Sequence, residues 1–360
     1  MDIRQVKQSE AVASIRENKY TGLIHVSPRV GKSKLMIDAL NFIKKPLKVL
    51  ILVPSVPIIK SWKAEIKKWG LSDLITPVFL WHNSLRKIKD SYDLIVCDEI
   101  HEYNDKVLLQ LKKHQIAGSR ILGLSGTINK QKEACLRSML NLKKIYEYTF
   151  EEAIADGVIA DYEIICVGCE LNEIDATVTA GTEDKPFKQT EYNAYEYWNN
   201  RYNNIAYNND YKMRKTIISK RKSIIYNSDT KINKTQEIVN SVDRCIVFTG
   251  LQEVADQMGQ ASYHSKSKDN SLEEFSLGHL DKLAVVSMVS MGITIPNLKV
   301  AVFNQVKSNE ALFIQQVLRT MNLDGDQKAT IYIVYLKNTQ DAVWVKSATE
   351  GFNKSKITFI

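Results

Sequence analysis

The stretch GLIHVSPRVGKSKLMIDALNFI, residues 22–43, predicts a short apolar strand, a loop and a helix in direct succession. Gly31 in the loop allows backbone N–H groups to approach phosphate oxygens, and Lys32 can reach the β- and γ-phosphates of a nucleotide. The hydroxyl of Ser33 can ligate magnesium, while the N-terminus of the helix adds its dipole. A phosphate-binding loop and a coincidental turn are equally compatible with this stretch taken alone.

A second stretch, YDLIVCDEIH at residues 92–101, ends a hydrophobic strand in two carboxylates, Asp98 and Glu99. In a parallel sheet, this strand and the strand before the glycine loop end at the same edge, where ligands collect. Asp98 can therefore hold magnesium beside Ser33, directly or through water, and Glu99 can polarise an attacking water. A solvated cluster of charges is the common alternative, but its order and distance behind the loop favour a nucleotide site.

Short apolar runs alternate with helix-like segments through the first half of the chain, which predicts a parallel sheet of about five or six strands covered by helices. The predicted strands are residues 22–26, 48–54, 76–81, 92–99 and 120–127, and the predicted helices are residues 31–43, 56–69 and 106–114. A second alternation begins near Asp243, with strands predicted at residues 244–250, 283–288, 299–305 and 329–336. The predicted architecture is therefore two α/β halves joined through a helical segment.

Residues 170–235 interrupt this pattern with a polar segment that is dense in Tyr, Asn and Lys. Apolar residues recur at roughly helical spacing from Tyr192 to Ile225, so mostly helices are predicted here. The tyrosines favour the packing face of a helical hairpin, although aromatics among Lys and Arg are also able to stack bases and grip phosphates. The cations at 212–214 and 220–222 are typical of a solvated face.

The overall composition is that of a soluble globular protein, with 44% hydrophobic and 25% charged residues among 360. Lys and Arg exceed Asp and Glu by 49 to 41, giving a net charge of +8. A positive field favours nucleic acid, but many lysines merely solvate a surface. No apolar run approaches the length of a membrane helix, and the N-terminus is polar, so a cytoplasmic protein without a membrane partner is expected (host cytoplasm if viral).

The five cysteines do not form a recognisable metal or disulfide pattern. Cys166 and Cys169 make one CxxC, but no second pair or flanking histidine completes a zinc site. The surrounding segment, EIICVGCEL, predicts a buried strand, so both cysteines are expected to be small core residues.

The residues Asp98-Glu99-Ile100-His101 resemble the DExH box of superfamily 2 helicases, and SPRVGKS at residues 27–33 resembles their motif I. Further resemblances follow in the family's order: the glutamine-containing opening at residues 7–12, motif Ia at 53–55, motif Ic at 84–85, motif III at 124–127, motif IV at 245–249, motif V at 291–296 and motif VI at 315–319. The chain is most similar to minimal phage-type branch-migration and recombination DNA helicases, because little of its sequence lies outside the stretch that these motifs span.

This resemblance implies two tandem RecA-like domains with a helical insert, ATP and Mg²⁺ as cofactors, and nucleic acid as the partner. Residues 1–160 would form the ATP-binding domain 1 and residues 236–360 would carry motifs IV to VI, with 161–235 as a crossover and helical segment of domain 2. The implied function is an ATP-dependent helicase or translocase, acting as a monomer on branched or duplex DNA rather than RNA.

The resemblance also implies roles for individual residues. The implied catalytic residues are Lys32, Asp98, Glu99, His101, Gln315 and Arg319. ATP binding is implied for Gln8, Pro28, Arg29, Val30, Gly31, Lys32 and Ser33, with Gln8 as the adenine reader and with Ser33 and Asp98 as the magnesium ligands. Coupling is implied for Ser125 and Thr127, and nucleic-acid binding for Pro54, Ser55, Ser84, Thr249, Ser287 and Gly292.

The sequence departs from the family pattern at several positions. Arg29 occupies a position of motif I that is often glycine, and Val26 replaces its leading glycine. Motif VI carries Arg319 alone, because Asn322 stands where a second arginine is usual. An ATP-gated binding or annealing protein with weak ATPase is therefore the rival hypothesis. Trp81, where motif Ic often has threonine, ends an apolar strand and is predicted to be a core residue rather than a base-stacking one.

Overall fold

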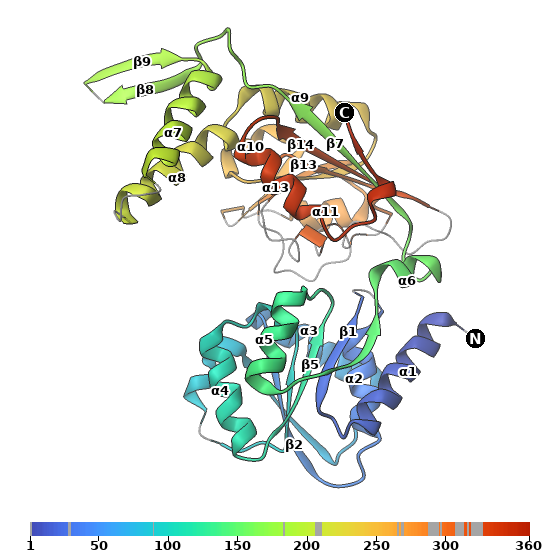
Figure 1. Ribbon diagram of the computed structural model, residues 1–360. Helices are drawn as coiled ribbons and strands as arrows, with labels where there is room; N and C mark the ends of the chain where they lie inside the picture. Colours follow the sequence, from blue (N-terminus) through green and yellow to red (C-terminus); the bar gives the residue numbers. More distant parts are fainter. Residues whose placement is uncertain are drawn as a thin grey trace. The chain divides into compact units, whose positions relative to one another are not determined.

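The computed structural model describes residues 2–27, 30–88, 90–182, 184–205, 211–264, 266–267, 270–286, 295, 297–306, 313–314, 317 and 327–360. These residues fall into two compact units, the first ending at Ala160 and the second beginning at Asp161. Each unit contains its own sheet (Figure 1). Within the described residues, no helix is both long and apolar enough to cross a membrane.

The sheet of the first unit has six strands among the described residues, in the order β3-β2-β4-β5-β1-β6, and every neighbouring pair is parallel. The strands are β1 (Gly22–Val26), β2 (Leu47–Val53), β3 (Ile75–Trp81), β4 (Leu94–Cys97), β5 (Arg120–Ser125) and β6 (Lys144–Tyr148). The first five were predicted as apolar runs, and β6 was not. The predicted strand at 92–99 ends early, at Cys97, so both carboxylates follow the strand.

Helices lie on both faces of this sheet (Figure 1). They are α1 (Ile3–Glu17), α2 (Lys32–Asn41), α3 (Val56–Trp69), α4 (Asp105–Ile116), α5 (Lys130–Leu140) and α6 (Phe150–Ala155), with short 3₁₀ turns η1 (His82–Lys87) and η2 (Ile100–Glu102). Side chains of α4 and α5 pack with those of the central strands into one buried apolar cluster. The parallel strands therefore read as continuous apolar runs because both of their faces are covered.

The sheet of the second unit has seven strands among the described residues, ordered β11-β12-β10-β13-β14-β7-β15, and every neighbouring pair is again parallel. The strands are β7 (Tyr162–Cys169), β10 (Cys245–Thr249), β11 (Ala261–Tyr263), β12 (Lys282–Val286), β13 (Val300–Phe303), β14 (Ala329–Leu336) and β15 (Ile357–Phe359). The predicted fold class, two parallel-sheet α/β domains, is confirmed. Cys166 and Cys169 lie buried in β7, as predicted.

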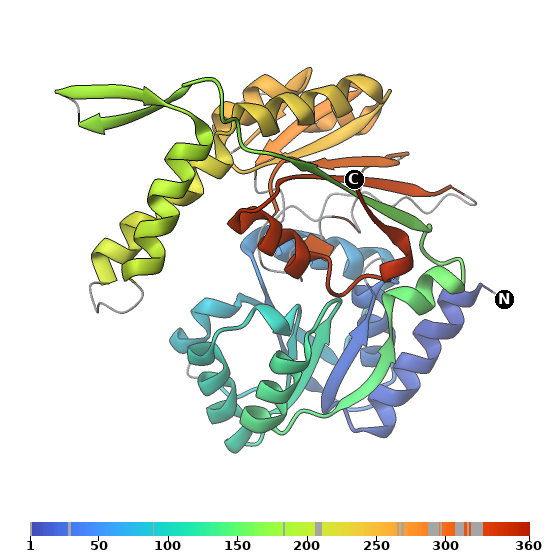
Figure 2. The same cartoon turned by 45° about the horizontal axis from the view of Figure 1, so that its top comes forward.

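The helices of the second unit include a pair that stands apart from its sheet (Figure 2). The pair is α7 (Glu191–Ile205) and α8 (Tyr211–Tyr226), preceded by the antiparallel hairpin β8 (Val178–Thr182) and β9 (Lys185–Gln189). The remaining helices are α9 (Asp229–Ser241), α10 (Gln252–Met258), α11 (Ser271–Leu277) and α13 (Gln340–Ala348), with the 3₁₀ turn η4 (Lys354–Lys356). The helices predicted between Tyr192 and Ile225 are present, whereas the hairpin was not predicted.

Candidate nucleotide-binding and catalytic site

The loop after β1 has a backbone conformation that requires glycine at position 31. Gly31 caps α2 with a φ of +93°, which lies in the left-handed region. A Cβ at this position would lie 2.7 Å from the amide nitrogen of Gln8. Gln8 is buried, and its Nε2 donates a hydrogen bond of 2.6 Å to the carbonyl of Val30. The first helix thus holds the loop in place, and the buried side chain of Val30 leaves only its backbone to face a ligand.

The side chain of Lys32, the first residue of α2, points to the end of β4. Its Nζ lies 2.9 Å from Oε1 of Glu99, and both side chains are largely buried. The other carboxylate oxygen of Glu99 accepts a hydrogen bond of 3.2 Å from the backbone N–H of Gly126. One carboxylate therefore joins the loop after β1 to the loop after β5.

Glu99 has a strained backbone and a perturbed carboxyl group. Its φ of +48° lies in the left-handed region, which costs free energy for a residue with a Cβ and persists where the surrounding structure enforces it. Burial raises the pKa of the Glu99 carboxyl, but the positive charge of Lys32 and the interaction with His101 outweigh burial and lower it. The side chain is therefore held as a carboxylate at neutral pH.

Asp98 has the opposite electrostatic balance. Burial and the neighbouring charge of Glu99 raise its pKa to about 6, although Lys32 and a hydrogen bond from Trp62 oppose the shift. The indole N–H of Trp62 donates to Oδ2 of Asp98 at 2.9 Å. A buried carboxylate that is costly to ionise is stabilised when a cation binds beside it. Strongly shifted carboxyls of this kind are concentrated at functional sites.

A chain of hydrogen bonds leads from the carboxylates to the loop after β5. Nδ1 of His101 lies 2.8 Å from Oγ of Ser125 and 3.5 Å from Oε2 of Glu99. Oγ of Ser125 donates its proton to the carbonyl of Thr127 at 2.8 Å, so Nδ1 of His101 carries the proton that it shares with Ser125. Burial lowers the pKa of His101, and Glu99 opposes this. The ring is therefore a neutral connector between the two loops.

The structure thus brings together several of the residues of domain 1 that were assigned to ATP chemistry and coupling. Lys32, Glu99, His101 and Ser125 form one connected cluster. Ser33 lies next along α2 and is half-buried. Several other candidate site residues fall outside the described residues, namely Pro28, Arg29, Ser287, Gly292, Gln315 and Arg319.

The candidate nucleic-acid residues of the first unit lie farther along the same sheet edge. Pro54 and Ser55 follow β2, and Ser84 lies in the turn after β3. The indole N–H of Trp81 donates to the carbonyl of Pro54 at 3.0 Å. The prediction that Trp81 is a core residue is wrong, because it is 39% exposed. The reason is that β3 is an edge strand whose side chains are mostly half-buried.

The candidate nucleic-acid residue Thr249 ends β10 in the second unit. Its side chain is buried, and its hydroxyl donates a hydrogen bond of 3.0 Å to the carbonyl of Leu251. The side-chain proton is therefore used within the protein.

Three residues of the site were not found from the sequence. Trp62 reaches Asp98 from the middle of α3, and the hydroxyl of Tyr103 donates to the carbonyl of Leu52 at 3.1 Å. Lys132, from α5, donates to the backbone carbonyl of Tyr103. These contacts join segments that are distant in sequence, and a strand–helix pattern gives no signal for them.

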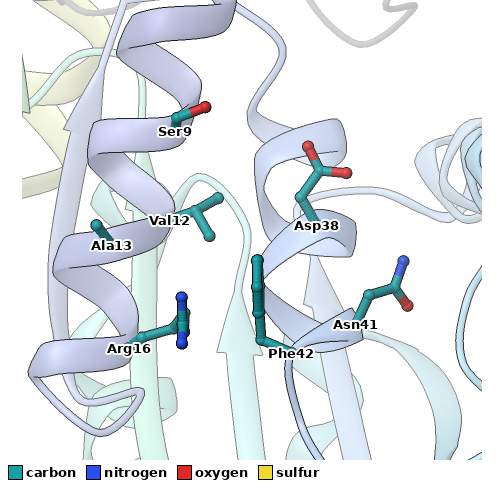
Figure 3. Close-up of a pocket in the computed structure, with 7 residues that line it drawn as sticks. All are labelled: Ser9, Val12, Ala13, Arg16, Asp38, Asn41 and Phe42. Carbon is teal, nitrogen blue, oxygen red and sulfur yellow. The ribbon is translucent and has the colours of Figure 1, made fainter.

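A separate groove of about 540 Å³ lies between α1 and α2 (Figure 3). Arg16 and Phe42 face each other across it, with the guanidinium 4.0 Å from the ring centre. Asp38 in its wall pairs with Lys34. None of the residues that were assigned to ATP chemistry lines this groove.

Comparisons with known proteins identify the fold. No protein-family model matches the chain, and no curated protein sequence matches it. Solved structures do match. S. cerevisiae Dbp5 bound to RNA and ADP BeF3 superimposes with a TM-score of 0.60 at 10% identity, covering 98% of this chain and 89% of that one. The Pyrococcus furiosus Hef helicase domain gives 0.58 at 13% identity, covering 96% and 97%.

A third structure is part of a much larger enzyme. The ATP-dependent Type ISP restriction-modification enzyme LlaBIII, bound to DNA, matches with a TM-score of 0.61 at 15% identity. All of this chain is covered, but only 31% of LlaBIII. At these identities the likeness establishes the fold: two tandem RecA-like domains of the kind found in helicase structures.

Proposed function

We propose that the protein is an ATP hydrolase of the superfamily 2 helicase type, which couples hydrolysis to movement along or unwinding of nucleic acid. The observation that carries the proposal is the connected cluster of Lys32, Glu99, His101 and Ser125. It links a glycine loop at a helix N-terminus to a pair of carboxylates and then to a third loop. A solvated cluster of charges has no reason to be buried or connected in this way.

The residues of the loop fit the phosphates of ATP. Gly31 adopts the left-handed backbone conformation that the turn into α2 requires, and α2 begins at Lys32 with its N–H groups and dipole directed toward the loop. Lys32 supports the fit because it already reaches across to the carboxylates. In the proposed cycle, the Lys32 ammonium leaves its ion pair with Glu99 and contacts phosphate oxygens instead when ATP binds.

The pair of Ser33 and Asp98 fits a magnesium ion that accompanies the nucleotide. Asp98 is the carboxylate that gains most from a nearby cation, since burial holds its pKa at about 6. When bound, Mg²⁺ supplies charge neutralisation between the β- and γ-phosphates. Trp62 orients Asp98 through its indole N–H.

In this proposal Glu99 is the general base. Its pKa is lowered in spite of burial, so it is ionised and able to accept a proton from an attacking water once Lys32 has moved to the phosphates. A change in the position or protonation of Glu99 is then transmitted through His101 and Ser125 to Thr127. The buried Oγ1 of Thr127 lacks a hydrogen-bond partner among the described residues. Ser125 and Thr127 are the proposed coupling residues.

The remaining assignments follow from the resemblance of the motifs. Gln8 is proposed to recognise adenine in addition to holding the loop. Gln315 and Arg319, which belong to the proposed domain 2 at residues 236–360, are proposed to contact the γ-phosphate. The proposed nucleic-acid contacts are those of Pro54, Ser55, Ser84, Thr249, Ser287 and Gly292. DNA, branched or duplex, is favoured over RNA on the similarity to phage-type branch-migration helicases.

The discriminating experiment is an ATP hydrolysis assay with matched nucleic acids. Rates are measured without nucleic acid and with single-stranded DNA, forked DNA, a four-way junction and RNA of equal length. We expect stimulation by DNA that is greatest with the branched substrates. Stimulation by RNA alone would contradict the DNA preference while leaving the motor assignment, whereas absence of any stimulation would contradict that assignment.

A second candidate function is an ATP-gated nucleic-acid-binding or annealing protein with weak ATPase. The observation that favours it is Asn322 in place of the second arginine of motif VI. Arg319→Ala decides between the two, because an arginine that stabilises the γ-phosphate is worth about 10³- to 10⁵-fold in rate. A loss of that order supports the motor. A loss below about fivefold supports the weak-ATPase alternative.

A further inference from the structure

The two helices α7 and α8, called here the helical arm, stand apart from the sheet of the second unit (Figure 2). They pack against each other, and none of the ATP-site assignments falls on them. The arm nevertheless carries the most unequal distribution of charge in the sequence.

Most of the chain's net positive charge is accounted for by α8. Its sequence, YKMRKTIISKRKSIIY, contains six Lys and Arg and no Asp or Glu. The whole chain has a net charge of +8, so the other 344 residues together contribute only +2. The excess of Lys and Arg over Asp and Glu in this protein therefore comes mainly from one helix.

This arrangement differs from the other charged helices. Several lysines on other helices pair with an acidic residue one turn away, as Lys7 does with Glu10, Lys34 with Asp38 and Lys234 with Glu237. Like charges one turn apart destabilise a helix. On α8 such repulsion has no acidic residue of the same helix to relieve it. A solvated face requires no such concentration of one sign, whereas a surface that meets an anionic partner does.

Three of the four lysines of α8 lie on one outer face of the helix. Ile217, Ile224 and Ile225 are buried against the rest of the second unit. Lys212, Lys215 and Lys222 are spaced three and seven residues apart, which places them on one side of the helix. All three are exposed, and they span about 15 Å along the axis at a rise of about 1.5 Å per residue.

The arm is fixed to the body of the second unit at its base. Arg221, which is buried, donates to Asn199 on α7 at 3.0 Å and to Gln340 on α13 at 3.2 Å. The hydroxyl of Tyr195 accepts a hydrogen bond of 2.8 Å from the backbone N–H of Gln340. The outer lysines are therefore mounted on a rigid element, and binding there costs little ordering of the chain.

Aromatic side chains lie on the same arm. Tyr211, at the start of α8, is 77% exposed, and Tyr197 on α7 is 50% exposed. The hydroxyl of Tyr197 accepts a hydrogen bond of 2.7 Å from Arg201. Exposed tyrosines among cations are the composition of surfaces that hold phosphates and stack bases.

We propose that the outer face of α8, formed by Lys212, Lys215 and Lys222, is a second nucleic-acid-binding surface that contacts backbone phosphates without reading sequence. The proposal rests on the proposed function, since it assigns a further contact with the same class of substrate. An anionic membrane is the other acidic partner to consider. Met213 and Ile218 of α8 are 46% and 39% exposed, so nucleic acid is favoured by the tyrosines that lie among the cations and not by a lack of apolar side chains.

The test compares two matched triple variants of the full chain. Lys212→Gln, Lys215→Gln and Lys222→Gln neutralise the arm. Lys44→Gln, Lys45→Gln and Lys113→Gln neutralise three exposed lysines at the opposite sheet edge from the glycine loop, in the first unit. Equilibrium binding to forked DNA is measured at several salt concentrations.

We expect the arm variant to bind forked DNA roughly tenfold or more weakly at low salt, with the salt slope reduced by about 2 to 3, because each phosphate contact contributes about 0.9 to it. The control variant should bind like wild type. A third variant with arginine at the three arm positions should retain affinity and the full slope, which separates charge from misfolding.

Unchanged affinity and slope in the arm variant would overturn the proposal. The proposal would also be overturned if the wild type bound vesicles of phosphatidylserine and phosphatidylcholine, and if the arm variant lost this binding but still bound DNA. The rate of ATP hydrolysis by the wild type is measured in a separate assay, with and without nucleic acid. Arm-dependent DNA binding without nucleic-acid-stimulated hydrolysis would reject the motor and keep the arm surface, and the converse would reject the arm surface alone.

Discussion

The ammonium of Lys32 lies 2.9 Å from a carboxylate oxygen of Glu99, so the lysine of the phosphate loop is paired with the proposed general base. In the proposed mechanism, each residue of this pair has to be released by the other before it can act. Lys32 must leave Glu99 to reach phosphate oxygens, and Glu99 gains its freedom to accept a proton only when Lys32 has left. The proposed function therefore links nucleotide binding to activation of the base through this single contact.

Glu99→Gln should separate binding from hydrolysis. The amide cannot accept a proton from water, so hydrolysis should fall by about 100-fold or more. Affinity for ATP with Mg²⁺ should be unchanged or increased, because Lys32 loses a competing carboxylate. Fluorescent-nucleotide titration and single-turnover hydrolysis measure the two quantities, with Glu102→Gln as a control at an exposed neighbour. Loss of nucleotide binding together with turnover would show that the roles of the two carboxylates are wrongly assigned.

Asp98→Asn should stabilise the ligand-free protein at neutral pH. The folded pKa of Asp98 is raised from 3.8 to about 6, so ionisation costs folded-state stability as pH rises through this window. The amide avoids that cost and can still accept from Trp62, for a gain of about 3 kcal/mol at pH 7. The gain should vanish toward pH 4, where Asp98 is protonated. Urea unfolding without magnesium at both pH values measures it, and a less stable variant at pH 7 would refute the assignment.

Trp62→Phe should move the pH dependence of hydrolysis upward. Without the indole donor, ionised Asp98 loses a hydrogen bond that lowers its pKa, so the acidic limb of the rate profile should shift to higher pH. The matched control is Trp69→Phe, since Trp69 donates to the half-buried Glu65 on the same helix. An identical pH profile in both variants would mean that Trp62 serves only to pack α3.

The buried pair of Lys231 and Asp341 should be essential to the second unit. Their side chains are 1% and 0% exposed and lie 2.5 Å apart. Lys231→Met leaves a buried carboxylate without its cation and should lower the free energy of unfolding by about 3–5 kcal/mol. The double variant Lys231→Met with Asp341→Leu should recover much of the loss. Equal destabilisation of the single and double variants in urea would contradict this account.

The sequence was most informative where strands are buried on both faces. The strand at Ala329–Leu336 was predicted with its exact bounds, because a covered parallel strand is a continuous apolar run. The strand at Lys144–Tyr148 was missed because it is an edge strand with half-buried side chains. The hairpin at 178–189 was missed for the same reason, since its residues are largely exposed.

The candidate site could be predicted as far as local motifs reach. Gly31, Lys32, Asp98 and Glu99 stand in loops whose spacing follows the strand–helix order. Trp62 could not be predicted, since its contact with Asp98 depends on how α3 packs on the sheet. The pairing of Lys32 with Glu99 likewise appears only when two strand ends meet in space.

The most direct test of the central claim is the rate of ATP hydrolysis by the wild type and by Lys32→Ala, each with and without forked DNA. If the cluster around Glu99 is an ATP-hydrolysing site, the wild type should hydrolyse ATP faster with DNA, and Lys32→Ala should lose hydrolysis under both conditions. Lys34→Ala, two residues further along α2 and paired with Asp38, is the matched control and should remain active. Near wild-type, DNA-stimulated turnover in Lys32→Ala would contradict the assignment of this site.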